Sequence, residues 1–324
     1  MTDTPTSGVV DLREREAAAS AAAASPAIHT VELAKRFGPT LALAGLSMTV
    51  PRGEVFGFLG PNGAGKTSAV KLLVGLIEPT SGEAWVLGRP LGDRGVRRRL
   101  GYLPELFRYQ PWLTGREVLA LHCRLMGLPP SRWREEIEGA LSMVGLDGDG
   151  DRRVETYSKG MQQRLGIGVA LAGSPELVLL DEPTSALDPV GRHDVRQIIH
   201  ELKQRGTAVF LNSHLLTEVE HVCDRVAMVD QGRVIATGTL DELLGGHACR
   251  VRATGMDGAA RASLRSFGRI EDEGEWLVVR GMDRERVPDL VAAIVGLGGR
   301  VYAVESRAKT LEDRFLELLG DVDA

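Results

Sequence analysis

Nine consecutive residues of this 324-residue chain have the composition and context of a phosphate-binding loop. They are Gly60, Pro61, Asn62, Gly63, Ala64, Gly65, Lys66, Thr67 and Ser68. The loop follows an apolar run of strand character over residues 55–59 and opens a segment of helical period over residues 68–77. Its three glycines allow a tight turn that brings backbone N–H groups close to an anion.

Two side chains of this loop could act on a bound triphosphate. Lys66 can reach the β- and γ-phosphates, and the Thr67 hydroxyl can hold Mg²⁺. A helix that begins near Lys66 would direct its free N–H groups and the positive end of its dipole at the same place. The stretch therefore predicts a nucleoside triphosphate site; the alternative is a glycine-rich turn that binds nothing.

Two adjacent carboxylates, Asp181 and Glu182, follow the apolar run Leu177–Leu180. That run lacks alternation, as expected of a strand buried on both faces of a parallel sheet. Acids at the end of such a strand are costly unless they meet cations or do chemistry. Asp181 can help to hold Mg²⁺, and Glu182 can orient or activate a water against the γ-phosphate. The alternative is a pair of solvated loop acids.

Three further positions could complete the site. His214 follows a predicted strand over residues 207–212, at the strand end where parallel sheets bind ligands, although a lone histidine is often structural. Ser158 and Gly160 stand where a helix begins, which is again the geometry of an anion site. Phe37 lies at a strand end and could stack on a purine or belong to the core.

The elements that must position these residues alternate between strands and helices. We expect strands at residues 28–36, 41–50 and 82–88, a helical insertion at about 106–172, and buried strands before Asp181 and Ser213. Within the insertion, Thr114 should cap a helix that ends at Met126, and Ser131 should cap another. This order predicts an α/β domain over residues 28–246, with a mainly parallel sheet, an antiparallel β subdomain and a helical subdomain.

The rest of the chain is predicted to have a different order of strands and helices. After a glycine linker at residues 245–246, strands and helices follow in the order βαββαβ, which predicts a small α+β ferredoxin-like accessory domain over residues 247–324. At the other end, residues 1–27 are Ala-rich and lack the basic start and apolar core of a signal peptide. We expect them to form a disordered tail.

Composition narrows the classes of function. The formal net charge is −5, which argues against a dedicated nucleic-acid binder. The three cysteines are far apart and form no CxxC pair, so neither a zinc site nor a disulfide framework is indicated. No apolar run approaches the ~20 residues that cross a bilayer.

The motifs and their order resemble those of the ATP-binding subunit of an ABC transporter. The resemblance covers residues 28–244 and rests on five segments: Gly60–Thr67, Tyr157–Arg164, Leu177–Glu182, Ser185–Asp188 and His214. It implies a P-loop NTPase core that binds ATP and Mg²⁺. It also implies that Lys66, Glu182 and His214 are catalytic, that Thr67 and Asp181 hold the metal, that Phe37 stacks on adenine, and that Asp188 and the Ser158 segment contact nucleotide.

The sequence departs from the family pattern at three places. The signature segment reads Tyr-Ser-Lys-Gly-Met, which keeps the Ser158 and Gly160 that approach the γ-phosphate. Glu105 stands where the family has a glutamine; a carboxylate can touch Mg²⁺ or a water but cannot donate a hydrogen bond, and Gln110 is a second candidate. Phe37 replaces the commoner tyrosine.

These variants, with the ending at residues 311–318, resemble bacterial exporters of drugs, polysaccharides, lipids or sodium whose permease is a separate chain. The resemblance implies an integral-membrane permease as partner, a second ATP-binding subunit, identical or related, and a peripheral position at the cytoplasmic face of the cell membrane. Alternatives are a soluble ABC-type ATPase that acts on ribosomes or DNA, and a P-loop kinase or GTPase.

Overall fold

The protein is described by a computed structural model, in which residues 25–185, 187–244, 247–308 and 310–322 are placed. The expected tail falls almost entirely outside these residues, as does the expected linker. The chain divides into two compact units between Thr237 and Gly238, earlier than the predicted boundary after residue 246. The short helix α8 (Leu240–Leu244) therefore groups with the second unit, because it packs against the last helix, α11 (Leu311–Val322).

An antiparallel sheet begins the first unit. Its strands run in the order β2-β1-β4-β5, with bounds Thr40–Val50, Ile28–Phe37, Ser81–Val86 and Arg89–Pro90. Phe37 pairs with Thr40 at the tight turn that joins β1 to β2. This sheet confirms the predicted antiparallel β subdomain.

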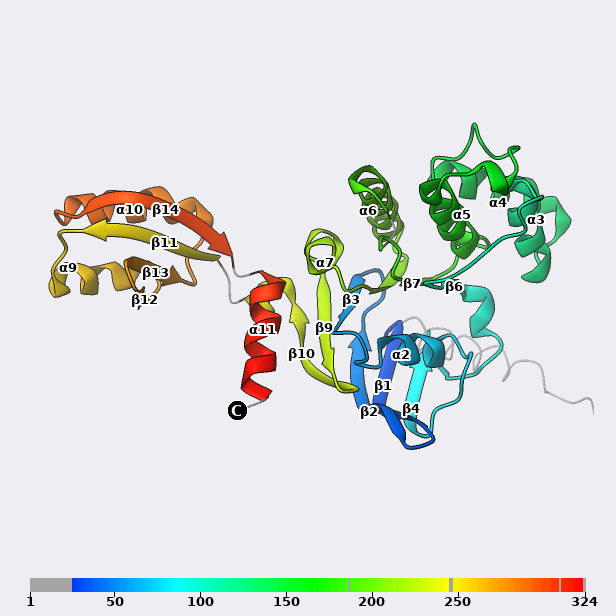
Figure 1. Ribbon diagram of the computed structural model, residues 1–324, viewed down its shortest axis with the longest axis horizontal. Coiled ribbons are helices and arrows are strands. Elements are labelled where there is room, and N and C mark those ends of the chain that lie inside the picture. Colours follow the sequence, from blue (N-terminus) through cyan, green and yellow to red (C-terminus); the bar gives the residue numbers. More distant parts are fainter. Residues whose placement is uncertain (1–24, 186, 245–246, 309, 323–324) are drawn as a thin grey trace, which may run out of the picture. The chain divides into compact units, whose positions relative to one another are not determined.

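A second sheet of six strands forms the centre of the unit (Figure 1). Its order is β10-β9-β3-β8-β7-β6, with bounds Arg233–Thr239, Arg225–Asp230, Val55–Leu59, Ala208–Asn212, Leu177–Asp181 and Leu100–Leu103. The five strands from β9 to β6 pair in parallel. Every residue of β3, β7 and β8 is buried, as the unbroken apolar runs predicted. The carboxyl ends of β3, β7 and β8 therefore meet at one edge.

Helices α2 (Lys66–Leu73), α6 (Pro189–Gln204) and α7 (Leu216–Val222) follow β3, β7 and β8 along the chain. The predicted helical insertion contains α3 (Gly115–Leu125), α4 (Pro130–Met143) and α5 (Lys159–Leu171), which pack on one another (Figure 1). Short 3₁₀ turns lie at Val96–Arg99 and Val154–Thr156.

The two predicted helix caps of the insertion have different outcomes. Thr114 caps α3 through a capping box with Glu117, as the sequence predicted. The prediction for Ser131 is wrong, since the N-cap of α4 is Pro129, two residues earlier, and Pro130 is the first residue of the helix. Proline suits that position because its fixed φ matches the helix and its missing N–H would have no partner there.

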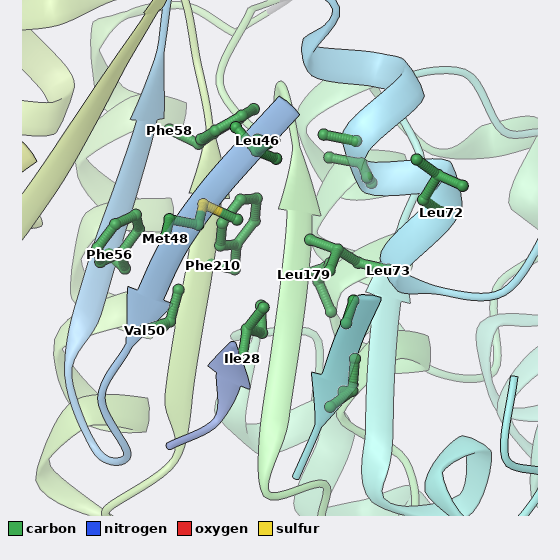
Figure 2. Packing of buried hydrophobic residues seen from close by; sticks show 14 of the residues in the cluster. Ile28, Leu46, Met48, Val50, Phe56, Phe58, Leu72, Leu73, Leu179 and Phe210 are labelled. Carbon is green, nitrogen blue, oxygen red and sulfur yellow. The ribbon is translucent and has the colours of Figure 1, made fainter. Parts of the chain in front are cut away.

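The core of the first unit joins the two sheets through α2. Phe56, Phe58 and Phe210 of the parallel sheet face Ile28, Leu46 and Met48 of the antiparallel sheet, with Leu72 and Leu73 of α2 alongside (Figure 2). The Phe58 and Phe210 rings lie 5.2 Å apart between centroids. Burial of each such side chain contributes about 1.5–3 kcal/mol to the stability of the folded state. This packing holds α2 against strands of both sheets.

The second unit has the predicted ferredoxin-like order. Strands β11 (His247–Thr254), β12 (Arg269–Glu273), β13 (Trp276–Arg280) and β14 (Arg300–Ala308) form an antiparallel sheet in the order β12-β13-β11-β14. Helices α9 (Gly258–Ser263) and α10 (Val287–Gly296) complete the split βαβ arrangement, with short 3₁₀ turns at Leu264–Ser266 and Arg284–Arg286. Across the described residues, no helix combines the length and the apolar character that a membrane span needs.

Candidate functional site

The predicted phosphate-binding loop connects β3 to α2. Gly65, the N-cap of α2, has φ of 94°, a conformation that glycine adopts without steric cost. A Cβ at Gly60 would lie 2.2 Å from the Val229 carbonyl oxygen, and one at Gly65 would lie 2.2 Å from that of Ala42. The loop therefore needs glycine at these two places, because it is clamped between β9 and β2.

Lys66 is turned inward at the start of α2. Its side chain donates to the carbonyl oxygens of Gly60 at 2.7 Å and Pro61 at 3.1 Å. Burial lowers the pKa of Lys66, and the nearby charges of Glu182, Asp181 and Glu105 oppose that shift. The fold thus brings into one electrostatic neighbourhood a cation and three acids that are up to 116 residues apart (182 − 66) in the chain.

Asp181 ends β7 and is fully buried. Burial raises its pKa, while a hydrogen bond from the side-chain amide of Asn212 lowers it. Asn212 ends the neighbouring strand β8 and is paired in register with Asp181. Asn212 was not predicted as a site residue, although a polar residue that ends the apolar run Ala208–Leu211 is a usable signal.

Glu182 is held through its backbone and through its side chain. Its φ is 52°, in the left-handed region, and its N–H donates to the Asn212 carbonyl oxygen at 2.9 Å. Its Oε2 lies 2.7 Å from Nδ1 of His214, whose ring is half-exposed. The structure therefore brings together Lys66, Asp181, Glu182 and His214, all four predicted from the sequence.

Glu105 follows β6, the strand next to β7 in the sheet. Tyr102 belongs to β6 and was not predicted from the sequence as a neighbour of the site; burial, with the charges of Asp181 and Glu105, raises its pKa to about 12. Glu105 is exposed, so it can reach a ligand from the rim of the site.

Four predicted ligand residues lie apart from this cluster. Ser158 caps α5 by accepting a hydrogen bond from the N–H of Met161 at 3.2 Å, with Gly160 in the same first turn. Asp188 caps α6 through the N–H of Gly191. Phe37 is 48% exposed, with Lys35 Nζ 5.0 Å from its ring centroid. Within the described residues, no hydrogen bond or ion pair joins these side chains to the phosphate-binding loop.

The oxygen donors at the loop fit a small divalent cation. Thr67 offers an exposed hydroxyl on the first turn of α2, and Asp181 offers a carboxylate in the charge neighbourhood of Lys66. Such hard oxygens are the ligands that Mg²⁺ prefers, together with waters and substrate phosphates. The part of the chain that the structure describes contains no group of three His, Cys, Asp or Glu side chains able to hold a metal by themselves.

A glycine loop at a helix start, with paired acids and a histidine at adjacent strand ends, defines a P-loop nucleoside triphosphatase. The sequence profile of the family described as "ABC transporter" matches residues 43–185. An ABC transporter ATP-binding protein of a Nostoc strain is 42% identical over 87% of this chain and 84% of its own length.

Two relatives with assigned roles are similar over most of their length. A Nod factor export ATP-binding protein of a Rhizobium strain is 36% identical over 91% of this chain and 97% of its own. A daunorubicin resistance ATP-binding protein of Streptomyces coeruleorubidus is 39% identical over 89% of this chain and 94% of its own. One solved ATP-binding subunit of an ABC transporter matches with a TM-score of 0.61 and 31% identity, over 67% of this chain and 91% of its own.

The chain belongs to the family of ABC transporter ATP-binding proteins. It is an ATP-binding and ATP-hydrolysing subunit of an ABC transporter. The P-loop core confirms the fold predicted from the motifs, and the transport subunits among its relatives support this function rather than the soluble alternative that acts on ribosomes or DNA.

Proposed function

We propose that this ATPase drives export through a separate integral-membrane permease, which holds it at the cytoplasmic face of the membrane. The proposal is supported by two relatives, one that exports Nod factor and one that confers daunorubicin resistance. As in such subunits, a second copy or a related ATP-binding chain would complete each ATP site.

The contact between Glu182 and His214 carries the proposed chemistry. Because Oε2 of Glu182 accepts from the ring of His214 and lies near the positive charge of Lys66, the carboxylate is held at the mouth of the phosphate loop. There it can take a proton from a water that attacks the γ-phosphate. His214 is half-exposed, so it can orient Glu182 on one side and meet the γ-phosphate on the other.

Other residues of the loop would bind the nucleotide. Lys66 would exchange its loop carbonyls for phosphate oxygens, and backbone N–H groups of residues 62–68 would surround the β-phosphate. Thr67, Asp181 and Glu105 would hold Mg²⁺ directly or through water, and the ion would neutralise charge on the β- and γ-phosphates. The Phe37 ring is half-exposed and could stack on adenine.

The residues that lie apart from the loop fit a role in the second subunit's site. Ser158 and Asp188 are exposed at helix starts, and the side-chain hydrogen bond that each makes goes to the first turn of its own helix. A neighbouring subunit could therefore receive Ser158 and Gly160 at its γ-phosphate, so that bound ATP joins the two chains. Binding would close the pair and hydrolysis would release it.

Replacing Glu182 by Gln tests the proposed base. Glu182→Gln keeps the shape but removes the proton acceptor, so ATP turnover should fall by about 100-fold or more while ATP binding is spared. Turnover is measured by phosphate release and binding by titration with a fluorescent ATP analogue. Glu83→Gln, an exposed change on β4, is the matched control and should hydrolyse ATP at the parent rate.

Two results would contradict the assignment. Hydrolysis by Glu182→Gln at the parent rate would show that Glu182 is not the base. Loss of ATP binding in the same variant would show that the carboxylate is needed for the site to form, which would also remove the basis of the proposed step.

A further inference from the structure

Asn212 lies at the carboxyl end of β8, between the two strands that carry the phosphate loop and Asp181. It is in register with Phe58 on β3 and with Asp181 on β7, and only 1% of it is exposed. Side chains in register on neighbouring parallel strands share a face of the sheet. Phe58 lies beside Leu46 in Figure 2 and belongs to the core cluster that also contains Leu72 and Leu73 of α2, so Asn212 lies on the face of the sheet against which α2 packs.

The chemistry of the contact with Asp181 determines which way the amide points. A carboxylate only accepts hydrogen bonds, so the NH₂ group of Asn212 must face Asp181 Oδ1, as it does at 2.5 Å. The amide oxygen, Oδ1, therefore points away from Asp181. It is buried and accepts no hydrogen bond from the described residues.

The backbone of Asn212 supports the other acid. Its carbonyl oxygen accepts the N–H of Glu182, which holds that residue in its left-handed conformation. One residue thus contacts both acids of the site, with its side chain on Asp181 and its main chain on Glu182.

A buried acceptor without a donor is costly and is expected to gain one in the working state of a protein. Mg²⁺ in nucleotide sites keeps several of its waters, and such waters are strong hydrogen-bond donors. We propose that Asn212 is a positioning residue for the metal. This inference rests on the Mg²⁺–ATP site proposed above. Its NH₂ group orients the carboxylate of Asp181, and its Oδ1 accepts a hydrogen bond from a water carried by Mg²⁺.

The replacement Asn212→Leu tests this role, because leucine has nearly the same size and neither donates nor accepts. Partners that orient metal ligands typically contribute 10- to 100-fold in metal affinity. We therefore expect the affinity for a fluorescent ATP analogue to fall about tenfold in the presence of Mg²⁺ and to stay unchanged in EDTA. A structural role alone would lower both affinities together.

Two companion variants keep the test decisive. Phe210→Leu changes the same strand and face two residues earlier, so it should lower stability and leave the ratio of the two affinities unchanged. Asn212→Ser is polar and small enough to fold if the leucine variant does not. Its hydroxyl is too short to reach Asp181 and a water together, so part of the Mg²⁺-dependent affinity should be lost.

The outcomes separate this inference from the proposed function. If the parent protein gains affinity with Mg²⁺ and both Asn212 variants keep the full gain, the role of Asn212 is overturned and the proposed site stands. Equal losses with Mg²⁺ and in EDTA overturn it as well. If the parent protein shows no gain with Mg²⁺, the proposed metal site itself is overturned.

Discussion

At the residue scale, Glu182 shows how the site uses an unfavourable backbone conformation. A non-glycine residue at φ 52° costs of order 1–3 kcal/mol and persists only where its surroundings impose it. Here β7 ends at the preceding residue, and the N–H of Glu182 is bound to the next strand. This turn sends Asp181 and Glu182 in different directions, so that one contacts Asn212 and the other His214.

Glu176, at the opposite end of β7, gives a residue-scale prediction about pH. Arg99 and Arg52 both donate to its carboxylate, and the hydrogen bond from Arg99 is the main cause of its lowered pKa. A carboxyl with a lowered pKa in the folded state stabilises the protein above its unfolded pKa, and this contribution is lost as pH falls through the folded value.

We therefore expect Glu176→Gln to lower the free energy of unfolding by about 1 kcal/mol at pH 7, a small value because the side chain is 43% exposed and solvent screens the ion pairs. The difference from the parent should shrink as pH falls below the ordinary glutamate value of 4.5. Urea unfolding at several pH values measures it. A difference that grows toward low pH would contradict the assignment.

At the element scale, the starts of α3 and α4 test what defines a helix end here. Thr114→Ala removes a side chain that accepts the Glu117 N–H, so it should cost about 1 kcal/mol of stability. Ser131→Ala is the matched control, because Ser131 lies inside α4 and caps nothing. Its effect should stay within about 0.5 kcal/mol. Equal losses in urea unfolding would restore Ser131 as a cap.

The same scale shows why some elements were predictable. The apolar runs of β7 and β8 have no polar residue that could face solvent, and every residue of both strands is buried. The sequence therefore located these two strands to within one residue. The start of α4 was misplaced because serine and proline are both favourable at helix starts and local sequence does not rank them.

At the scale of the whole molecule, the proposed pair of subunits makes a prediction about mixtures. Lys66→Ala and Ser158→Arg should each be inactive as ATPases. If each site takes its loop from one chain and its Ser158 from the other, a mixed dimer keeps one intact site. A 1:1 mixture should then recover about a quarter of the parent ATPase rate.

A second mixture serves as the control. Lys66 and Glu182 belong to one electrostatic cluster within a single chain, so mixing Lys66→Ala with Glu182→Gln leaves no intact site and should recover nothing. Phosphate release after subunit exchange measures both mixtures. Failure of the first mixture to exceed its separate components would place Ser158 outside the partner's site.

The sequence by itself determined the chemistry of this protein: the loop, the paired acids, the histidine and the order of strands and helices. These are local, because glycine conformation, strand burial and helix starts depend on neighbouring residues. Only the tertiary structure decided which groups meet. The register of β7 with β8 sets Asn212 against Asp181, and packing of α2 on the sheet turns Lys66 toward the acids. Register and packing depend on strands far apart in the chain, which no local pattern specifies.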